Sequence, residues 1–105
     1  MGLKKFSKYE YDLMLIVLNA VARSEYIVDW FLQNQDKGFG YVHALENDIR
    51  AQRGLTAAQV YLLYEFTQFC IKLAREAGAH FDDEHARCGF NRLLKLEKIL
   101  GERLW

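Results

Sequence analysis

Histidines and carboxylates gather around residue 80 and form the group in this chain best suited to metal or acid–base chemistry. Carboxylates and imidazoles are ligands of divalent metal ions. However, His80 and His85 lie five residues apart, whereas ligands on one helix face are three or four apart. His85 and Cys88 have that spacing, but no second pair completes a site. We therefore predict no metal and no cofactor, and interpret the cluster as the acidic start of a helix. Its members are Glu76, His80, Asp82, Asp83, Glu84 and His85.

Arg75 precedes His80 with four residues between them. This spacing resembles the R-x4-6-H motif of the HEPN ribonucleases, which are small helical bundles that usually dimerise. The resemblance implies that Arg75 would steady the scissile phosphate and that His80 would act in proton transfer. Gly78 lies between the two, so we expect Arg75 on a helix and His80 in the following loop. Ribonuclease activity is the second alternative for function, and we favour a protein that is not an enzyme.

Basic residues suggest a second kind of partner, a nucleic acid. Arg50 and Arg53 lie where two predicted helices join, and a helix-turn-helix would place such a junction on DNA. Arg92 and Lys95 belong to the basic side of the last predicted helix. The would-be reading helix is rich in tyrosine and leucine rather than in polar side chains that reach base edges. A nucleic-acid-associated regulator is therefore the first alternative.

Aromatic residues point to the function that we favour. The chain has two tryptophans, six tyrosines and seven phenylalanines, more than a small helical core hides easily. Tyrosine and tryptophan are enriched in protein interfaces. We predict that Tyr26, Trp30, Tyr61 and Tyr64 contact a partner. The expected function is a small interaction or regulatory module that binds another protein, or itself as a homodimer.

The elements that must position these residues are helices. Thr56 and Gln59 form a capping box at the start of a helix that Gly78 ends, so we expect a helix over about 56–77. Apolar residues occupy two of its faces: Val60, Leu63, Thr67, Cys70, Ile71 and Ala74 on one, and Leu62, Phe66, Phe69 and Leu73 on the other. A helix that is apolar on two faces must be covered on both. The predicted fold is therefore all-α, a bundle of four or five helices around this central helix.

The other helices follow from caps and breaks. A first helix starts at Ser7 with Glu10; it either runs to Asn34 or bends at Ser24. After a loop over 36–40, a shorter helix spans Tyr41 to Arg53 and ends at Gly54. The last helix starts at Asp82 or Asp83, and its apolar residues are Phe90, Leu93, Leu94, Leu96, Ile99, Leu100 and Leu104. Gly89 lies inside this helix, where we expect a close crossing with another helix.

Composition limits the remaining possibilities. With 105 residues the chain forms one domain, 1–105. Its formal net charge is zero, so no global field attracts nucleic acid or an acidic membrane. The longest apolar run is far shorter than the ~20 residues that span a bilayer. The two cysteines are expected on separate helices and reduced. We expect a soluble, cytoplasmic protein.

Overall fold

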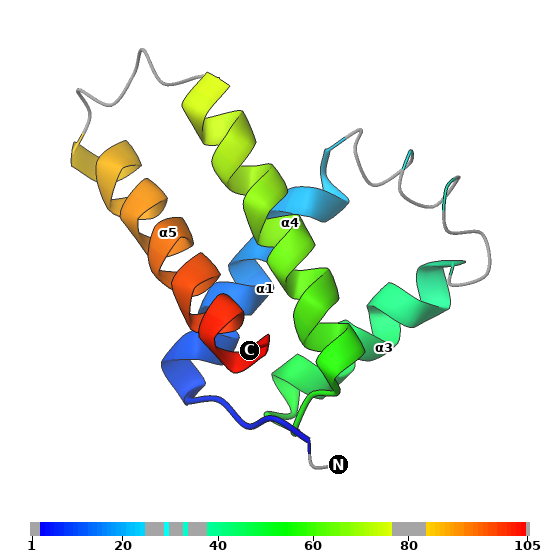
Figure 1. Cartoon of the computed structure of the whole chain (residues 1–105). Helices are drawn as coiled ribbons and strands as arrows, with labels where there is room; N and C mark the ends of the chain where they lie inside the picture. Colours follow the sequence, from blue (N-terminus) through cyan, green and yellow to red (C-terminus); the bar gives the residue numbers. More distant parts are fainter. Residues whose placement is uncertain (1–2, 25–28, 30–32, 34–37, 77–83, 105) are drawn as a thin grey trace.

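Four helices form the part of the chain described by the computed structural model, which covers residues 3–24, 29, 33, 38–76 and 84–104. They are α1 (Lys8–Ala22), α3 (Gly38–Arg50), α4 (Ala57–Glu76) and α5 (Glu84–Leu104) (Figure 1). Within these residues there is no strand, only one antiparallel bridge between Lys4 and Leu55. The predicted all-α fold is confirmed.

Helix α1 begins as its sequence predicts. The Ser7 hydroxyl accepts a hydrogen bond from the backbone N–H of Glu10 at 3.2 Å, and the Glu10 carboxylate accepts one from the N–H of Ser7 at 2.6 Å. The helix ends at Ala22, and both the N–H and the hydroxyl of Ser24 donate to the carbonyl of Val21. A single helix from Ser7 to Asn34 is therefore wrong. The alternative segment predicted after Ser24 lies mostly outside the described residues.

Helix α3 begins and ends earlier than the glycines suggest. It starts at Gly38, so the part of the predicted loop at 38–40 is helical, and it stops at Arg50 rather than at Arg53. Gln52 adopts a left-handed conformation, with φ of 55°. The N–H of Arg53 donates to the carbonyl of Asp48, and that of Gln52 to the carbonyl of Ile49. This pair of bonds is a Schellman motif, in which glutamine takes the position that glycine usually occupies.

Helix α4 matches its prediction closely. The Thr56 N–H donates to the Gln59 side chain at 2.9 Å, and the Gln59 N–H donates to the Thr56 hydroxyl at 3.1 Å. Both predicted apolar faces contribute buried residues, namely Val60, Leu62, Leu63, Phe66, Thr67 and Ile71. Leu73 differs, since 44% of it is exposed. The buried Thr67 hydroxyl bonds to the carbonyl of Leu63 one turn back, which satisfies its polar group.

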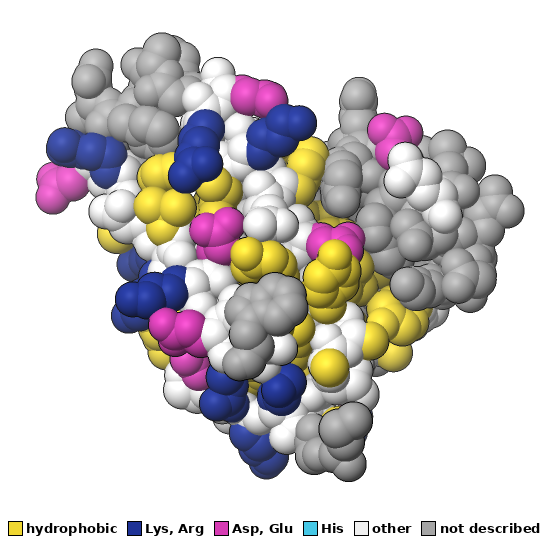
Figure 2. All heavy atoms as spheres, in the orientation of Figure 1, with side chains coloured by type: hydrophobic (Ala, Val, Ile, Leu, Met, Phe, Trp, Pro, Cys, Tyr) yellow, Lys and Arg dark blue, Asp and Glu magenta, His cyan; other side chains and the backbone are white. Residues whose placement is uncertain are grey.

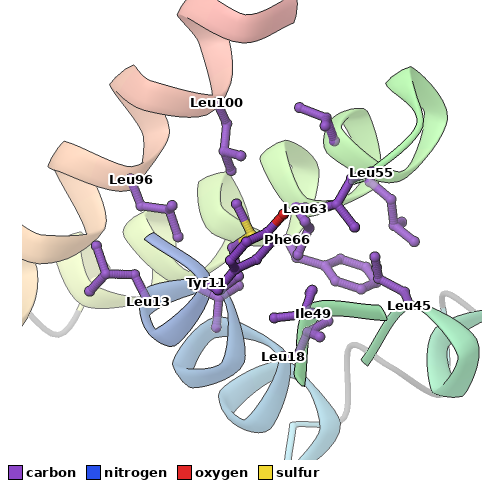
Figure 3. Close-up of a cluster of buried hydrophobic side chains, with 14 of the residues drawn as sticks. Tyr11, Leu13, Leu18, Leu45, Ile49, Leu55, Leu63, Phe66, Leu96 and Leu100 are labelled. Atoms are coloured by element: carbon purple, nitrogen blue, oxygen red, sulfur yellow. The ribbon is translucent and has the colours of Figure 1, made fainter. Parts of the chain in front are cut away.

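The helices meet around one core (Figure 3). Figure 1 shows α4 and α5 side by side, with α1 crossing behind them and α3 at the other side of α4. Helix α4 packs most extensively on α5 and also on α1, as expected for a helix that is apolar on two faces. Helix α1 packs on all three other described helices, so it shares the central position with α4. Core side chains from every helix meet there, among them Met14, Leu45, Ile49, Leu63, Phe66, Leu96 and Leu100.

The N-terminal segment ties the α3–α4 corner to the rest of the fold. Lys4 and Leu55 exchange two backbone hydrogen bonds, of 2.7 and 2.8 Å. A Cβ placed on Gly54 would lie 2.7 Å from the Cβ of Leu3, closer than real Cβ atoms approach one another. The buried Tyr11 hydroxyl donates to the carbonyl of Arg53 at 2.5 Å. Gly54 is therefore needed for the close approach of the N-terminal segment and does not end the preceding helix.

Candidate binding site

The residues of the predicted metal or acid–base cluster are only partly described. His80, Asp82 and Asp83 lie outside the described residues, and the side chain of His85 does too. Glu76 and Glu84 are exposed at the end of α4 and the start of α5. Within the described ranges, no three His, Cys, Asp or Glu side chains are grouped so as to hold a metal ion.

Of the two residues that resemble the HEPN motif, the structure describes Arg75 alone. Its guanidinium lies 6.0 Å from the centroid of the Phe90 ring, which places it against α5 near the end of α4. His80 falls outside the described residues. The ribonuclease alternative stays a prediction from sequence.

Both arginines at the α3–α4 corner are paired with carboxylates. Arg50 donates to Glu46 at 2.8 Å, and Arg53 donates to Asp48 at 3.1 Å. Asp48 also accepts a hydrogen bond from the Gln59 amide at 3.0 Å. The Gln59 amide, and next the Arg53 guanidinium, hold the pKa of Asp48 below its usual value. A phosphate at this corner would compete with these carboxylates for both arginines.

The other two basic residues of the nucleic-acid hypothesis lie together on α5. Arg92 and Lys95 line a shallow surface hollow of about 570 Å³, here called the basic cleft, with Tyr9, Glu84, Arg87, Cys88 and Asn91. The ammonium of Lys95 lies 4.9 Å from the centroid of the Tyr9 ring, which is within the range of a cation–π contact. In the described part of the chain, Arg87 and Arg92 make no ion pair with a carboxylate. These two cations are therefore available to an external anion.

The structure describes two of the four aromatic residues predicted to bind a partner. Tyr61 is 51% exposed on α4. Tyr64 is half-buried against the core, and a Cβ on Gly101 of α5 would make ordinary contact with its ring. Tyr26 and Trp30 lie outside the described residues. Figure 2 shows hydrophobic side chains gathered over the middle of one face, with basic and acidic ones interspersed on its α5 side.

A second cleft, which we call the apolar cleft, opens between α1 and α5 beside the basic cleft. Its volume is about 240 Å³, and its lining is mostly aliphatic: Leu13, Ile16, Val17 and Ala20 of α1, Cys70 of α4, and Gly89, Arg92, Leu93 and Leu96 of α5. The α1 and α5 residues each follow the i, i+3, i+4, i+7 spacing of one helix face. Buried core residues such as Val17 and Leu96 form its floor, whereas Ile16 is 52% exposed at its mouth.

Two features explain why this cleft is open and uncharged inside. Gly89 is exposed, and a Cβ there would meet no described atom within 4 Å, so the cleft is open to solvent beside it. The close crossing that the sequence predicts at Gly89 is therefore wrong. Burial raises the pKa of the Cys70 thiol, which disfavours the charged thiolate. Cys70 thus contributes an apolar wall, and Arg92 contributes the positive charge at the boundary with the basic cleft.

Two residues of this site, Ile16 and Gly89, are noticeable in the sequence, but the sequence does not show that they border a cleft. Ile16 belongs to the apolar run of the first helix, yet its exposure depends on where α5 crosses α1. Gly89 is a glycine inside the predicted last helix, where it costs about 1 kcal/mol relative to alanine. Only the tertiary structure distinguishes a glycine that admits a neighbouring helix from one that leaves a cleft.

Two further findings bear on the class of protein. No described helix is both long and apolar enough to cross a membrane. Comparison with protein-family models, with curated proteins and with solved structures finds no match to this chain.

Proposed function

We propose that the chain is a protein-binding module and that its partner is an acidic amphipathic helix bound at the α1–α5 face. We define this face as the apolar cleft together with the basic cleft. The observation that carries the proposal is that an exposed aliphatic cleft adjoins two arginines, Arg87 and Arg92, that have no carboxylate partner among the described residues. An amphipathic helix in a groove needs both features, apolar contact and a charged rim.

The dimensions of the face fit a helix. The apolar cleft follows α1 from Leu13 to Ala20, which is about two turns or 10 Å at 1.5 Å per residue. A partner helix that lies along the cleft would contribute apolar residues at i, i+3 or i+4, and i+7. Its acidic residues would lie beside them, facing Arg87 and Arg92. This pairing gives a specific orientation and a faster encounter more than it gives affinity.

A nucleic acid fits the same face less well. Phosphate contacts need cations but no aliphatic cleft. Helix α5 has five basic residues, but three acidic residues, Glu84, Glu97 and Glu102, are interspersed with them. At the α3–α4 corner, both Arg50 and Arg53 already have carboxylate partners. These observations favour a protein partner over a nucleic acid.

The experiment compares two exposed apolar residues on different surfaces. Ile16 on α1 is 52% exposed and Tyr61 on α4 is 51% exposed, so a lysine at either site has a similar chance of being solvated. The probe is a phage-displayed library of helical peptides, selected against the wild-type chain. We expect acidic amphipathic peptides to be enriched. We further expect Ile16→Lys to abolish their binding and Tyr61→Lys to leave it within about twofold, because surface changes usually alter stability by less than 0.5 kcal/mol.

The opposite result would assign the binding site to a different surface. If Tyr61→Lys abolishes binding and Ile16→Lys does not, the aromatic surface predicted from sequence is the binding surface and the α1–α5 face is not. Light scattering of the same variants over a tenfold concentration range tests the predicted homodimer. A dimer lost in Ile16→Lys would make the occupant a second copy of this chain. Binding of a labelled RNA or DNA oligonucleotide that Arg92→Gln weakens, with no peptide selected, would favour the nucleic-acid alternative.

A further inference from the structure

Gly89 lies inside a 21-residue helix without either of the usual structural reasons for a glycine. Its backbone is not in the left-handed region, and no described atom lies within 4 Å of the position where a Cβ would stand. Alanine at this position would therefore stabilise the helix. Natural sequences carry such suboptimal residues through mutation and selection alone, so the candidate role of Gly89 rests on its position in the fold. Gly89 borders the apolar cleft.

The cleft that Gly89 borders has the size and chemistry to take one side chain. The apolar cleft has a volume of about 240 Å³. An aliphatic cavity of about 150 Å³ is enough to bind benzene. Its floor consists of buried core residues, including Val17 and Leu96, which are held by the packing of α1 against α5. The pocket is therefore preformed, and filling it requires no rearrangement of the core.

The positive charge of Arg92 at the edge of the cleft favours a ligand that carries an anionic group next to its apolar group. Arg92 lines both the apolar and the basic cleft, so its guanidinium is next to any group that occupies the former. The described carboxylates make two ion pairs, and neither involves Arg92. An apolar group with a carboxylate two or three bonds beyond it would satisfy both the aliphatic lining and this cation.

We propose that the apolar cleft is the anchor pocket of the α1–α5 face, which takes one large aromatic or branched side chain from the partner while a neighbouring carboxylate pairs with Arg92. This inference rests on the proposed function, since it assigns the position at which the partner helix is held. Interfaces commonly concentrate their binding energy in such a buried anchor. Gly89 is then a specificity-determining residue, because its side chain would occupy the pocket.

The first test uses a small probe that needs no partner protein. Indole-3-propionate combines an aromatic ring with a carboxylate, and its amide lacks the charge. We expect NMR titration of the ¹⁵N-labelled chain to move the amide signals of residues along the apolar cleft, with millimolar affinity. Arg92→Gln should weaken the acid by about two- to fivefold, as for an exposed ion pair, and leave the amide unchanged.

Substitutions at Gly89 separate binding from folding. We expect Gly89→Leu to weaken the probe by about tenfold or more and Gly89→Ala by about fourfold, in order of side-chain size. Both should raise the melting temperature, by about 4–8 °C for alanine. The matched control is Gly101→Ala on the same helix, where the added Cβ makes only ordinary contact with Tyr64. It should raise the melting temperature and leave probe affinity unchanged.

Each outcome decides between the two proposals. Equal affinity of the probe for the wild-type chain and for Gly89→Leu, or signals that move elsewhere, would overturn the anchor pocket. If selected helical peptides bind Gly89→Leu as tightly as the wild type, the pocket is again overturned while the binding face stands. If no peptide is selected and the probe still binds in a manner that depends on Gly89, the protein-binding function fails and the cleft stands as a site for apolar carboxylates.

Discussion

Replacement of Gly54 by alanine should destabilise the protein even though the backbone at this position suits alanine. The added Cβ would lie 2.7 Å from the Cβ of Leu3, whereas carbon atoms pack best at about 3.5–4.0 Å. Both atoms are attached directly to backbone, so a change of rotamer cannot relieve the clash. The segment at Leu3 must retreat by about 1 Å. That movement disrupts the pair of backbone hydrogen bonds between Lys4 and Leu55.

The magnitude follows from two opposing terms. Loss of two backbone hydrogen bonds costs about 1–3 kcal/mol. Alanine restricts the unfolded chain and returns about 0.4–1 kcal/mol. We therefore expect the free energy of unfolding to fall by about 1–2 kcal/mol for Gly54→Ala. With a urea m-value of roughly 1–2 kcal/mol/M, the unfolding midpoint should move down by about 1 M.

The assay is urea unfolding followed by circular dichroism, with amide exchange of Leu55 as a local readout. Gly40→Ala is the matched control, because no described atom lies within 4 Å of its added Cβ, and it should raise the midpoint. Leu3→Gly removes the clashing Cβ. Gly54→Ala should therefore lower the unfolding midpoint much less in the Leu3→Gly background than in the wild type. A Gly54→Ala midpoint at or above that of the wild type, with unchanged exchange at Leu55, would refute the reasoning.

Three further predictions concern the same corner of the fold. Gln52→Gly should raise the free energy of unfolding by about 1 kcal/mol, since φ of 55° is strained for glutamine; a lower urea midpoint would contradict this. Tyr11→Phe should lower the free energy of unfolding by about 1 kcal/mol, because it removes the hydrogen bond to the Arg53 carbonyl. An unchanged urea midpoint would show that this hydrogen bond does not stabilise the fold. The pKa of Asp48 is lowered by Gln59 and Arg53, so its stabilising effect is present above about pH 4 and is lost as pH falls through the lowered pKa. The difference in stability between the wild type and Asp48→Asn should accordingly be largest near neutral pH and shrink in acid; a difference that grows in acid would reverse the sign.

Local sequence determined the helices because their signals act over three or four residues. The capping boxes at Ser7 and Thr56 form as predicted, since each needs only a side chain and a backbone N–H one turn away. Apolar periodicity likewise identified the buried faces of α4. A glycine mispredicts the end of a helix where a contact with a distant part of the chain is the reason for the glycine. The sequence predicts the end of α3 at Gly54, but Gly54 is needed for the approach of Leu3, whereas Gln52 takes the left-handed position.

The candidate site depended on tertiary structure, because it consists of gaps and pairings between helices. The sequence shows that Arg50, Arg53 and Arg92 are basic, and only the fold shows that the first two have carboxylate partners while Arg92 borders an apolar cleft. A helix-interior glycine is equally consistent with a close crossing or a cleft. The fold decides the matter at Gly89, since this residue is exposed and no described atom lies within 4 Å of its Cβ position.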